Sequence, residues 1–163
     1  MHKITVVSQC VFDEMMAKRN LDDSNVDEIK DEAFISIIGT KECLEHYLHE
    51  PNTVHWFKDG HDNVLNLDFD DIAEDIVHDG HTYKAMSNDQ AEKTVEFIER
   101  NIGKDFTIHC RAGVSRSQGV GCFIHDMYEG YSDESLLRDF ANKGVIMRLK
   151  HVLNNRNYGN LME

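Results

Sequence analysis

Apolar runs alternate with charged and amphipathic stretches along the chain, and this pattern predicts β-strands separated by helices. The apolar runs are rich in Val, Ile, Leu and Phe and have the length of buried strands. They lie at Lys3 to Ser8, Ala33 to Ile38, Val64 to Phe69 and Phe106 to Ile108, with a shorter one at Val54 to Phe57. Buried strands that alternate with helices form parallel sheets. We therefore expect one α/β domain over residues 1–163, with a mainly parallel central sheet flanked by helices.

Capping residues and glycines mark the predicted helices. Ser87 to Gln90 forms a capping box, so we expect a helix from there to about Asn101, closed by Gly103. Weaker signals predict helices at 13–19, 41–49, 118–128, 132–142 and 146–154. The charged stretch at 21–32 is expected to be an exposed connection.

Composition places the chain among ordinary globular proteins. Hydrophobic residues make up 40% and charged residues 29% of the chain, as in a domain with a substantial core. The start of the chain lacks the long apolar region of a secretory signal. Four cysteines, at positions 10, 43, 110 and 122, have the spacing of neither a zinc site nor a disulfide framework. We therefore expect a cytoplasmic protein with reduced thiols, no metal and no other cofactor, in which Cys10, Cys43 and Cys122 are small core residues.

The net charge of −13, from 30 acidic and 17 basic residues, restricts the expected partners. An acidic surface repels the phosphates of duplex nucleic acid and the headgroups of anionic membranes, so neither is expected to bind. No apolar run reaches the length of a membrane span. A small phosphorylated group is compatible with this charge, because a single pocket can be positive in an acidic protein.

The segment from His109 to Ser117, HCRAGVSRS, combines a nucleophile with groups that bind an anion. It lies between the apolar run that ends at Ile108 and the helix expected from Gln118. The backbone amides of residues 111–116 can point inward at the start of that helix and surround an oxyanion. Arg116 adds a planar group that can bind two of its oxygens. A thiol in a strand, phosphate loop and helix arrangement predicts a phosphatase.

HCRAGVSRS resembles the phosphate-binding loop of the cysteine-based protein tyrosine phosphatases, in particular their compact dual-specificity branch of the bacterial and phage type. Phe34 to Ile37 is similar to an early core strand of those small members, and Val64 to Ile72 to their strand and acid-bearing turn. Asn154 to Asn157 resembles the Pro-Asn-Arg segment that ends such domains, although Asn154 replaces the usual proline. The resemblance covers about residues 33–161.

This resemblance implies a role for each residue of the loop. Cys110 would be the thiolate that attacks phosphorus and forms a phosphocysteine intermediate. Arg116 would bind the phosphoryl group and stabilise the transition state, and Ser117 would help the thiolate to leave in the second step. His109 would support the loop by hydrogen bonding and, with the amides and Arg116, would lower the pKa of Cys110. The substrate-binding residues would be Arg111, Ala112, Gly113, Val114, Ser115 and Arg116.

A leaving alkoxide or phenolate needs a proton, so the resemblance also implies a carboxylic acid from another loop. Asp71 aligns best with this general acid, and Asp70 and Asp75 are the alternatives. Asp71 lies farther before Cys110 than in typical small members. The extra residues fall at 73–86, an acidic insert with histidines that could cover the mouth of the pocket.

The leading hypothesis is a phosphatase for phosphotyrosine in proteins, and also for phosphoserine or phosphothreonine. One alternative is a phosphatase of a non-protein substrate, such as an inositol phosphate, a nucleotide or an RNA 5′ end. Lipid-directed relatives carry lysines in the loop, whereas residues 111–115 contain none. Rhodaneses and the related cell-cycle phosphatases fit the Ser-Arg-Ser ending less well. Outside enzymes, the alternative is a phosphate-binding module with little turnover.

Overall fold

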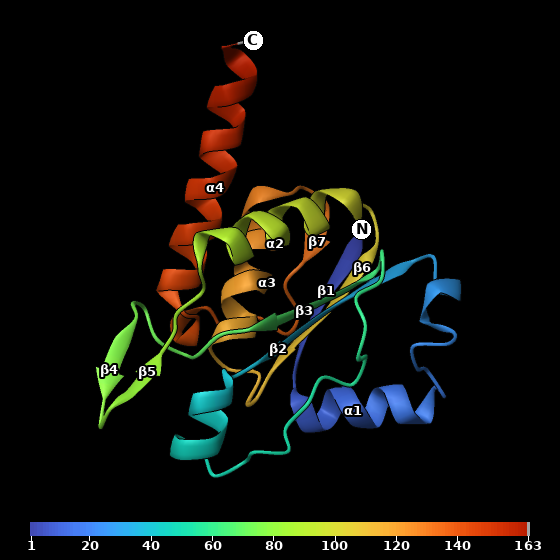
Figure 1. The fold of residues 1–163 in the computed structure, drawn as a ribbon. Helices are drawn as coiled ribbons and strands as arrows, with labels where there is room; N and C mark the ends of the chain where they lie inside the picture. Colours follow the sequence, from blue (N-terminus) through green and yellow to red (C-terminus); the bar gives the residue numbers. More distant parts are fainter. Residues whose placement is uncertain (163) are drawn as a thin grey trace.

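The computed structural model describes residues 1–162 and has a five-stranded sheet at its centre (Figure 1). The strand order is β3-β2-β6-β1-β7, and every neighbouring pair is parallel. The strands are β1 (His2–Ser8), β2 (Glu32–Ile38), β3 (Val64–Asp68), β6 (Asp105–Cys110) and β7 (Tyr131–Ser132). The predicted fold class, a single α/β domain with a parallel sheet between helices, is confirmed.

Helices cover both faces of this sheet (Figure 1). They are α1 (Gln9–Lys18), α2 (Asn88–Arg100), α3 (Arg116–Met127) and α4 (Lys143–Leu161). Helices α2, α3 and α4 enclose the larger hydrophobic core on one face, whereas α1 covers a smaller core on the other. The C-terminal part of α4 extends beyond the sheet (Figure 1). Within residues 1–162, none of the helices combines the length and hydrophobicity that crossing a membrane requires.

The interior strand β2 supplies side chains to both cores. Successive side chains of a strand point to opposite faces, so Ile35 lies in the larger core and Phe34 in the smaller one. There Phe34 contacts Phe12 of α1, with ring centroids 6.1 Å apart. A strand covered on both faces is a continuous apolar run, which is why this run is the clearest strand signal in the sequence. The one polar residue among its buried positions is Ser36.

The start of α2 is confirmed as a capping box. Ser87 Oγ accepts a hydrogen bond from Gln90 N at 3.1 Å, and Gln90 Oε1 accepts one from Ser87 N at 2.9 Å. Gly103 follows the end of α2 with φ of 87°. This is the left-handed region that favours glycine after a helix.

The helix predicted at 132–142 does not form. The chain there pairs with β1 as β7 and then makes only a 3₁₀ turn at Arg138–Phe140. Ser135 Oγ accepts a hydrogen bond from Val6 N at 2.8 Å, and Gln118 Nε2 donates one to Ser135 O at 3.1 Å. The carbonyl of Ser135 is thus bonded to α3 and not within a helix of its own, and the segment follows an irregular path with turns. The prediction fails because its partners are distant in sequence.

Four other segments also differ from the prediction. Residues 54–57 form an irregular loop instead of a strand, and a short π-helical turn, Cys43–Tyr47, lies within the helix expected at 41–49. The insert at 73–86 contains a hairpin of β4 (Ile76–His78) and β5 (His81–Tyr83). The last helix is longer than predicted and begins at Lys143, because Asn142 Oδ1 caps it.

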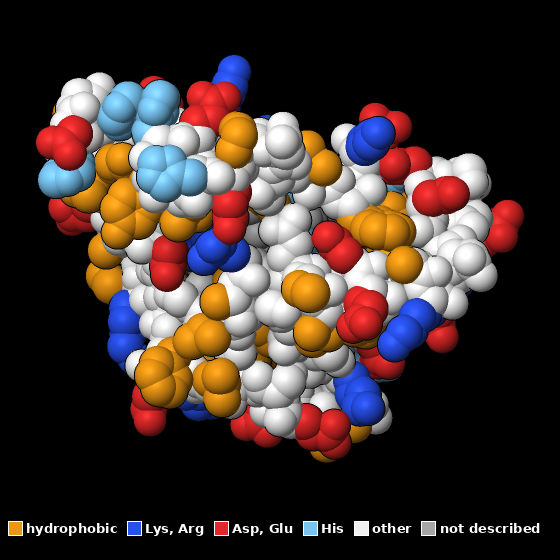
Figure 2. All heavy atoms as spheres, turned by 90° about the horizontal axis from the view of Figure 1, so that it is seen from below, with side chains coloured by type: hydrophobic (Ala, Val, Ile, Leu, Met, Phe, Trp, Pro, Cys, Tyr) orange, Lys and Arg blue, Asp and Glu red, His pale blue; other side chains and the backbone are white. Residues whose placement is uncertain are grey.

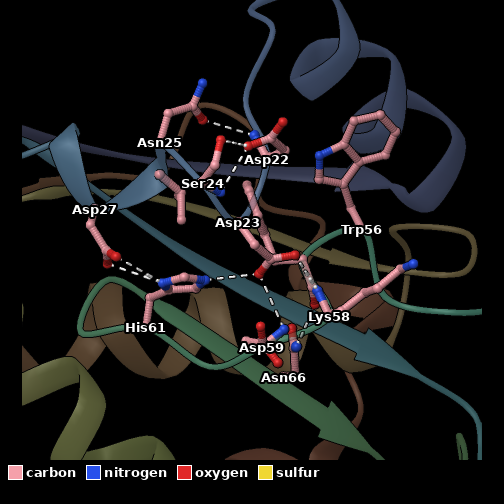
Figure 3. Close-up of polar contacts among 12 residues, drawn as sticks. Asp22, Asp23, Ser24, Asn25, Asp27, Trp56, Lys58, Asp59, His61 and Asn66 are labelled. Carbon is pink, nitrogen blue, oxygen red and sulfur yellow. Dashed lines mark hydrogen bonds and ion pairs between the residues drawn. The ribbon is translucent and has the colours of Figure 1, made fainter.

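His61 connects the loop between α1 and β2 to the turn before β3 (Figure 3). Its Nε2 lies 2.8 Å from Asp23 Oδ1, and its Nδ1 lies 3.0 Å from Asp27 Oδ1. Asp23 also accepts hydrogen bonds from the backbone nitrogens of Lys58 and Asp59. The hydrogen bond to Asp23 is the main cause that raises the pKa of His61 above its ordinary value.

This raised pKa predicts a pH-dependent effect of His61→Gln. The protonated imidazole stabilises the fold fully below its unfolded-state pKa of about 6.5, and this contribution is lost as the pH rises through the folded-state pKa. We expect the substitution to lower the free energy of unfolding by roughly 1 kcal/mol near pH 5.5 and by much less near pH 8.5. Urea unfolding at both pH values measures the difference, with exposed His151→Gln as the control. An equal loss at both values would contradict the assigned role.

Candidate active site

The loop between β6 and α3 is held in place by a close approach to the end of β1. Gly113 has φ of 72°, which favours glycine. A Cβ at this position would lie 2.6 Å from the carbonyl carbon of Val7, so no side chain fits. Gln9 N donates a hydrogen bond to Arg111 O at 3.2 Å. These contacts close the loop around Cys110, the last residue of β6.

The Cys110 thiol lies under this loop, and the residue is only 2% exposed. Its Sγ lies 3.0 Å from Ser117 Oγ. Burial is the largest single effect on the pKa of this thiol and raises it, but hydrogen bonds from the side chain and amide of Ser117, the charge of Arg116 and the amide of Ser115 outweigh burial. The pKa of Cys110 is therefore lowered, as a nucleophilic thiolate requires.

Arg116, the first residue of α3, is buried beside the thiol with one donor left free. Its Nη1 donates a hydrogen bond to Phe69 O at 2.8 Å, which fixes the guanidinium in place. Its buried Nε has no hydrogen-bond partner among residues 1–162. Buried donors normally have partners. The free Nε is therefore suited to donate to an anion bound at the loop.

His109 supports the loop as an uncharged residue. Its Nδ1 lies 3.3 Å from Cys110 O, and its Nε2 lies 2.7 Å from Ser36 Oγ. The ring also contacts Phe12, with centroids 4.4 Å apart. Burial is the main cause that lowers the pKa of His109 to about 4. Near pH 7 the imidazole is therefore neutral, and His109 acts on the loop through hydrogen bonds and not through a charge.

A cavity of about 600 Å³ opens beside the loop. Cys110, Ser115 and Arg116 line one side of it, together with Arg111, Ala112 and Val114. Gly113, Ser117 and His109 are not in its lining and support the loop from within. The remaining walls are largely apolar and include Leu44, Tyr47, Leu48, Ile72, Ile76 and Tyr83.

The β4–β5 hairpin forms part of the cavity wall and packs on the helical turn after β2. His46 and His81 stack with centroids 3.9 Å apart, and Tyr47 meets Tyr83 edge to face at 6.0 Å. Both elements lie on the lower side of Figure 1. Figure 2 views that side and shows histidines gathered at one corner beside exposed hydrophobic side chains. The insert at 73–86 thus borders the cavity instead of lying apart from it.

Asp71 is the candidate acid whose carboxylate contacts the loop. Its Oδ1 accepts hydrogen bonds from Ser115 Oγ at 2.6 Å and from Asn142 Nδ2 at 2.9 Å. The residue is exposed and lines the cavity. Asp71 is therefore placed where a group bound at the loop can be reached.

The two alternative acids have structural partners instead. Asp70 is 2% exposed, and its oxygens accept hydrogen bonds from the amide and hydroxyl of Thr40 and from Lys84 N. Asp75 accepts a hydrogen bond from Ala85 N at 2.9 Å and does not line the cavity. Neither carboxylate contacts the loop, so the geometry favours Asp71.

Arg111 points to the rim of the cavity and is already paired. Its Nε and Nη2 donate to the two carboxylate oxygens of Glu50 at 3.0 and 2.6 Å. The side chain is about half exposed. This ion pair compensates its charge, so Arg111 offers a substrate less positive charge than Arg116 does.

The cysteines outside the loop differ from one another. Cys122 is buried, as predicted, but Cys10 is exposed and Cys43 lines the cavity, so the prediction of core positions is wrong for these two. Burial first, and then the charge of Asp70, raises the pKa of Cys43 to about 11. Of the two thiols that line the cavity, only that of Cys110 therefore has a lowered pKa. In the described part of the chain, no three His, Cys, Asp or Glu side chains are arranged to hold a metal ion.

Several polar residues that support the site were not predicted from the sequence. Ser36 and Asn142 contact His109 and Asp71, and Ser36 also contacts His55, whose ring reaches Asp68. Ser36 had a usable signal, since it is a lone polar residue in an apolar run. The other contacts depend on loops whose paths the sequence pattern does not indicate.

No protein-family model, curated protein or solved structure matches this chain. A thiol with a lowered pKa, a free guanidinium donor and a carboxylate lie around one cavity.

Proposed function

We propose that this protein is a cysteine-dependent phosphatase that hydrolyses phosphomonoesters through a phosphocysteine intermediate on Cys110. The observation that supports this most is the buried Arg116 Nε, which has no partner within residues 1–162 and lies beside a thiol with a lowered pKa. A cation and a nucleophile at the start of a helix suit a tetrahedral anion. The loop sequence HCRAGVSRS further supports membership of the compact dual-specificity branch of the cysteine-based protein tyrosine phosphatases.

The proposed reaction has two steps. In the first, Cys110 Sγ forms a bond to phosphorus as the ester oxygen leaves, and Asp71 donates a proton to that oxygen. Arg116 and the loop amides bind the equatorial oxygens, whose charge they stabilise in the transition state. In the second, water attacks phosphorus, Asp71 takes a proton from it, and Ser117 donates a hydrogen bond to the departing thiolate.

The proposed substrate is a phosphotyrosine side chain in a protein, with phosphoserine and phosphothreonine as slower substrates. The largely apolar cavity walls can contact an aromatic ring, with Tyr47, Ile72 and Tyr83 among the lining residues. Loop residues 111–115 contain no lysine, and the chain has a net charge of −13. A polyanion such as an inositol polyphosphate is therefore a poorer match than a single aryl phosphate.

A phosphate-release screen of the purified protein tests this proposal. The panel contains phosphotyrosyl, phosphoseryl and phosphothreonyl peptides, nucleotides, an RNA 5′ phosphate and inositol phosphates, with a Cys110→Ser preparation as the blank. We expect the phosphotyrosyl peptide to be hydrolysed fastest. Faster phosphate release from a nucleotide, RNA or inositol phosphate would contradict the proposed substrate class but not the proposed mechanism. Phosphate binding without release from any compound would identify a binding module.

The guanidinium of Arg116 gives a further prediction. Arg116→Lys keeps the charge but replaces a planar group of several donors with a single ammonium. We expect the rate to fall by at least ~10²-fold, the scale of losing one oriented transition-state contact. The measurement is kcat/KM with a phosphotyrosyl peptide. Arg19→Lys, at an exposed pair with Glu32, is the control. A rate close to that of the wild type would contradict the clamp role.

A further inference from the structure

A chain of hydrogen bonds runs from the surface of the molecule to the backbone of Cys110. Asp68 Oδ1 lies 2.5 Å from His55 Nε2, and His55 Nδ1 lies 2.6 Å from Ser36 Oγ. The same Ser36 Oγ lies 2.7 Å from His109 Nε2, and His109 Nδ1 lies 3.3 Å from Cys110 O. The outer side chain, Asp68, is 60% exposed, whereas His109 is fully buried. The chain therefore links solvent to the candidate active site.

The hydroxyl of Ser36 can donate a hydrogen bond to only one of its two imidazole neighbours at a time. It has a single proton to donate and lies between two imidazole nitrogens. If it donates to one ring, the nitrogen of the other ring must carry a proton and donate to Oγ. His109 carries a single N–H near pH 7, because burial lowers its pKa to about 4. The direction of the Ser36 hydroxyl therefore selects the tautomer of His109.

Two protonation states of the chain follow from this geometry. When His55 carries both protons, it donates to Asp68 and to Ser36, Ser36 donates to His109 Nε2, and His109 Nδ1–H donates to Cys110 O. When His55 is neutral, Nε2–H still donates to Asp68, but Ser36 donates to His55 and His109 donates to Ser36 from Nε2. The bare Nδ1 of His109 then faces the carbonyl oxygen of Cys110. The two states differ by one proton, which passes to solvent.

We propose that His55, Ser36 and Asp68 are positioning residues, which control the Cys110 peptide and the reactivity of its thiol through the tautomer of His109. Among the charged groups near these residues, Asp68 from β3 contacts His55, and the charge of Arg116 from α3 acts on His109. Protonated His55 keeps the bond from His109 to Cys110 O and adds a positive charge, and both stabilise the thiolate. The link to turnover rests on the proposed function, whereas control of the thiol does not.

The tautomer of His109 can be observed directly by NMR of the full chain with ¹⁵N-labelled histidine. We expect the proton of His109 to move from Nδ1 at acid pH to Nε2 at alkaline pH, as the series of hydrogen-bonded residues loses one proton. In His55→Gln this change disappears, because no imidazole remains to contact Ser36 at that place. In Asp68→Asn the His55 ring loses its carboxylate partner, so the change of the His109 tautomer should no longer match that of the wild type. Asp68 is exposed, so the second variant remains informative if the first does not fold.

A second readout is the rate at which iodoacetamide alkylates Cys110 as a function of pH, followed by mass spectrometry of its peptide. We expect His55→Gln to raise the midpoint by about one pH unit, a typical size for an altered local environment. The matched control is His61→Gln, which removes a histidine that contacts the carboxylates of Asp23 and Asp27 and lies outside this series of hydrogen bonds. The control should leave both the tautomer change and the midpoint as in the wild type.

The outcomes separate this inference from the proposed function. A single His109 tautomer in the wild type from about pH 5 to 9, or a His55→Gln variant that behaves as the wild type in both measurements, would overturn the positioning chain. Phosphate release is measured on the same proteins. If the tautomer and midpoint changes occur without any hydrolysis, the positioning role of His55, Ser36 and Asp68 is supported and the proposed phosphatase activity is contradicted. If hydrolysis occurs with neither change, the proposed phosphatase activity is supported and the positioning role of His55, Ser36 and Asp68 is contradicted.

Discussion

Cys110→Ser is expected to abolish turnover while the protein stays folded and still binds phosphate. A serine hydroxyl ionises far less readily than a thiol and is a poorer leaving group, so neither step of the proposed reaction can proceed. We expect phosphate release to fall by at least ~10⁴-fold, as when other enzymes lose their nucleophile. Binding survives because Arg116 Nε and the loop amides do not depend on the sulfur. Rates are measured with a phosphotyrosyl peptide, and binding of inorganic phosphate by calorimetry.

The covalent intermediate gives a direct test of the same prediction. Wild-type protein quenched in acid during turnover should carry one phosphoryl group on Cys110, and the serine variant should carry none. Vanadate should inhibit the wild type by binding at the loop. Cys10→Ser, which alters an exposed thiol outside the cavity, is the control. Turnover near the wild-type rate in Cys110→Ser would rule out the mechanism.

Asp71→Asn is expected to reduce turnover by roughly 10²–10⁴-fold with alkyl or phenyl phosphates, the range for loss of an acid catalyst. The asparagine keeps the size of the side chain and can still contact Ser115 and Asn142, but it has no proton to donate to the leaving oxygen. The loss should be much smaller with an ester whose leaving group is already a weak base. The basic limb of the pH–rate profile should also flatten. The measurement is kcat across a series of phenyl phosphates.

Two neighbouring carboxylates serve as controls for this prediction. Asp75→Asn should change turnover little, because its carboxylate binds Ala85 N and does not line the cavity. Asp70→Asn should mainly lower stability, because Asp70 is buried and bonded to Thr40 and Lys84. If turnover of the Asp70→Asn or Asp75→Asn variant falls by an amount that depends on the leaving group, that residue is the acid instead of Asp71. No such loss at any of the three would indicate a protein that binds phosphate without hydrolysing it efficiently.

The residues around Cys110 were predictable because their signals are local. A strand, a glycine that must adopt a left-handed conformation and a helix start within ten residues restrict the loop to few conformations. Gly113 shows this directly, since any Cβ would collide with Val7. The charge state of His109 was not predictable in the same way. It depends on burial beneath Phe12 of α1, far away in the sequence.

The choice between Asp70 and Asp71 also lay outside the reach of sequence. Both residues line the cavity, but the Asp70 carboxylate is buried and the Asp71 carboxylate is exposed and contacts the loop. The Asp70 carboxylate is held by Thr40 and Lys84. The Asp71 carboxylate is held by Asn142. The sequence spacing between an aspartate and Cys110 does not indicate these contacts.

The sequence by itself determined the order of the central strands along the chain, the capping box of α2 and the loop that holds a cysteine and an arginine together. Hydrophobic periodicity, capping and tight turns act between neighbours, so a linear pattern records them. Only the tertiary structure decided that residues 132–142 do not form a helix, that a hairpin borders the cavity, and that Ser36 lies between two histidines. Each of these depends on partners from separate segments. Their contacts exist only once the sheet has brought those segments together.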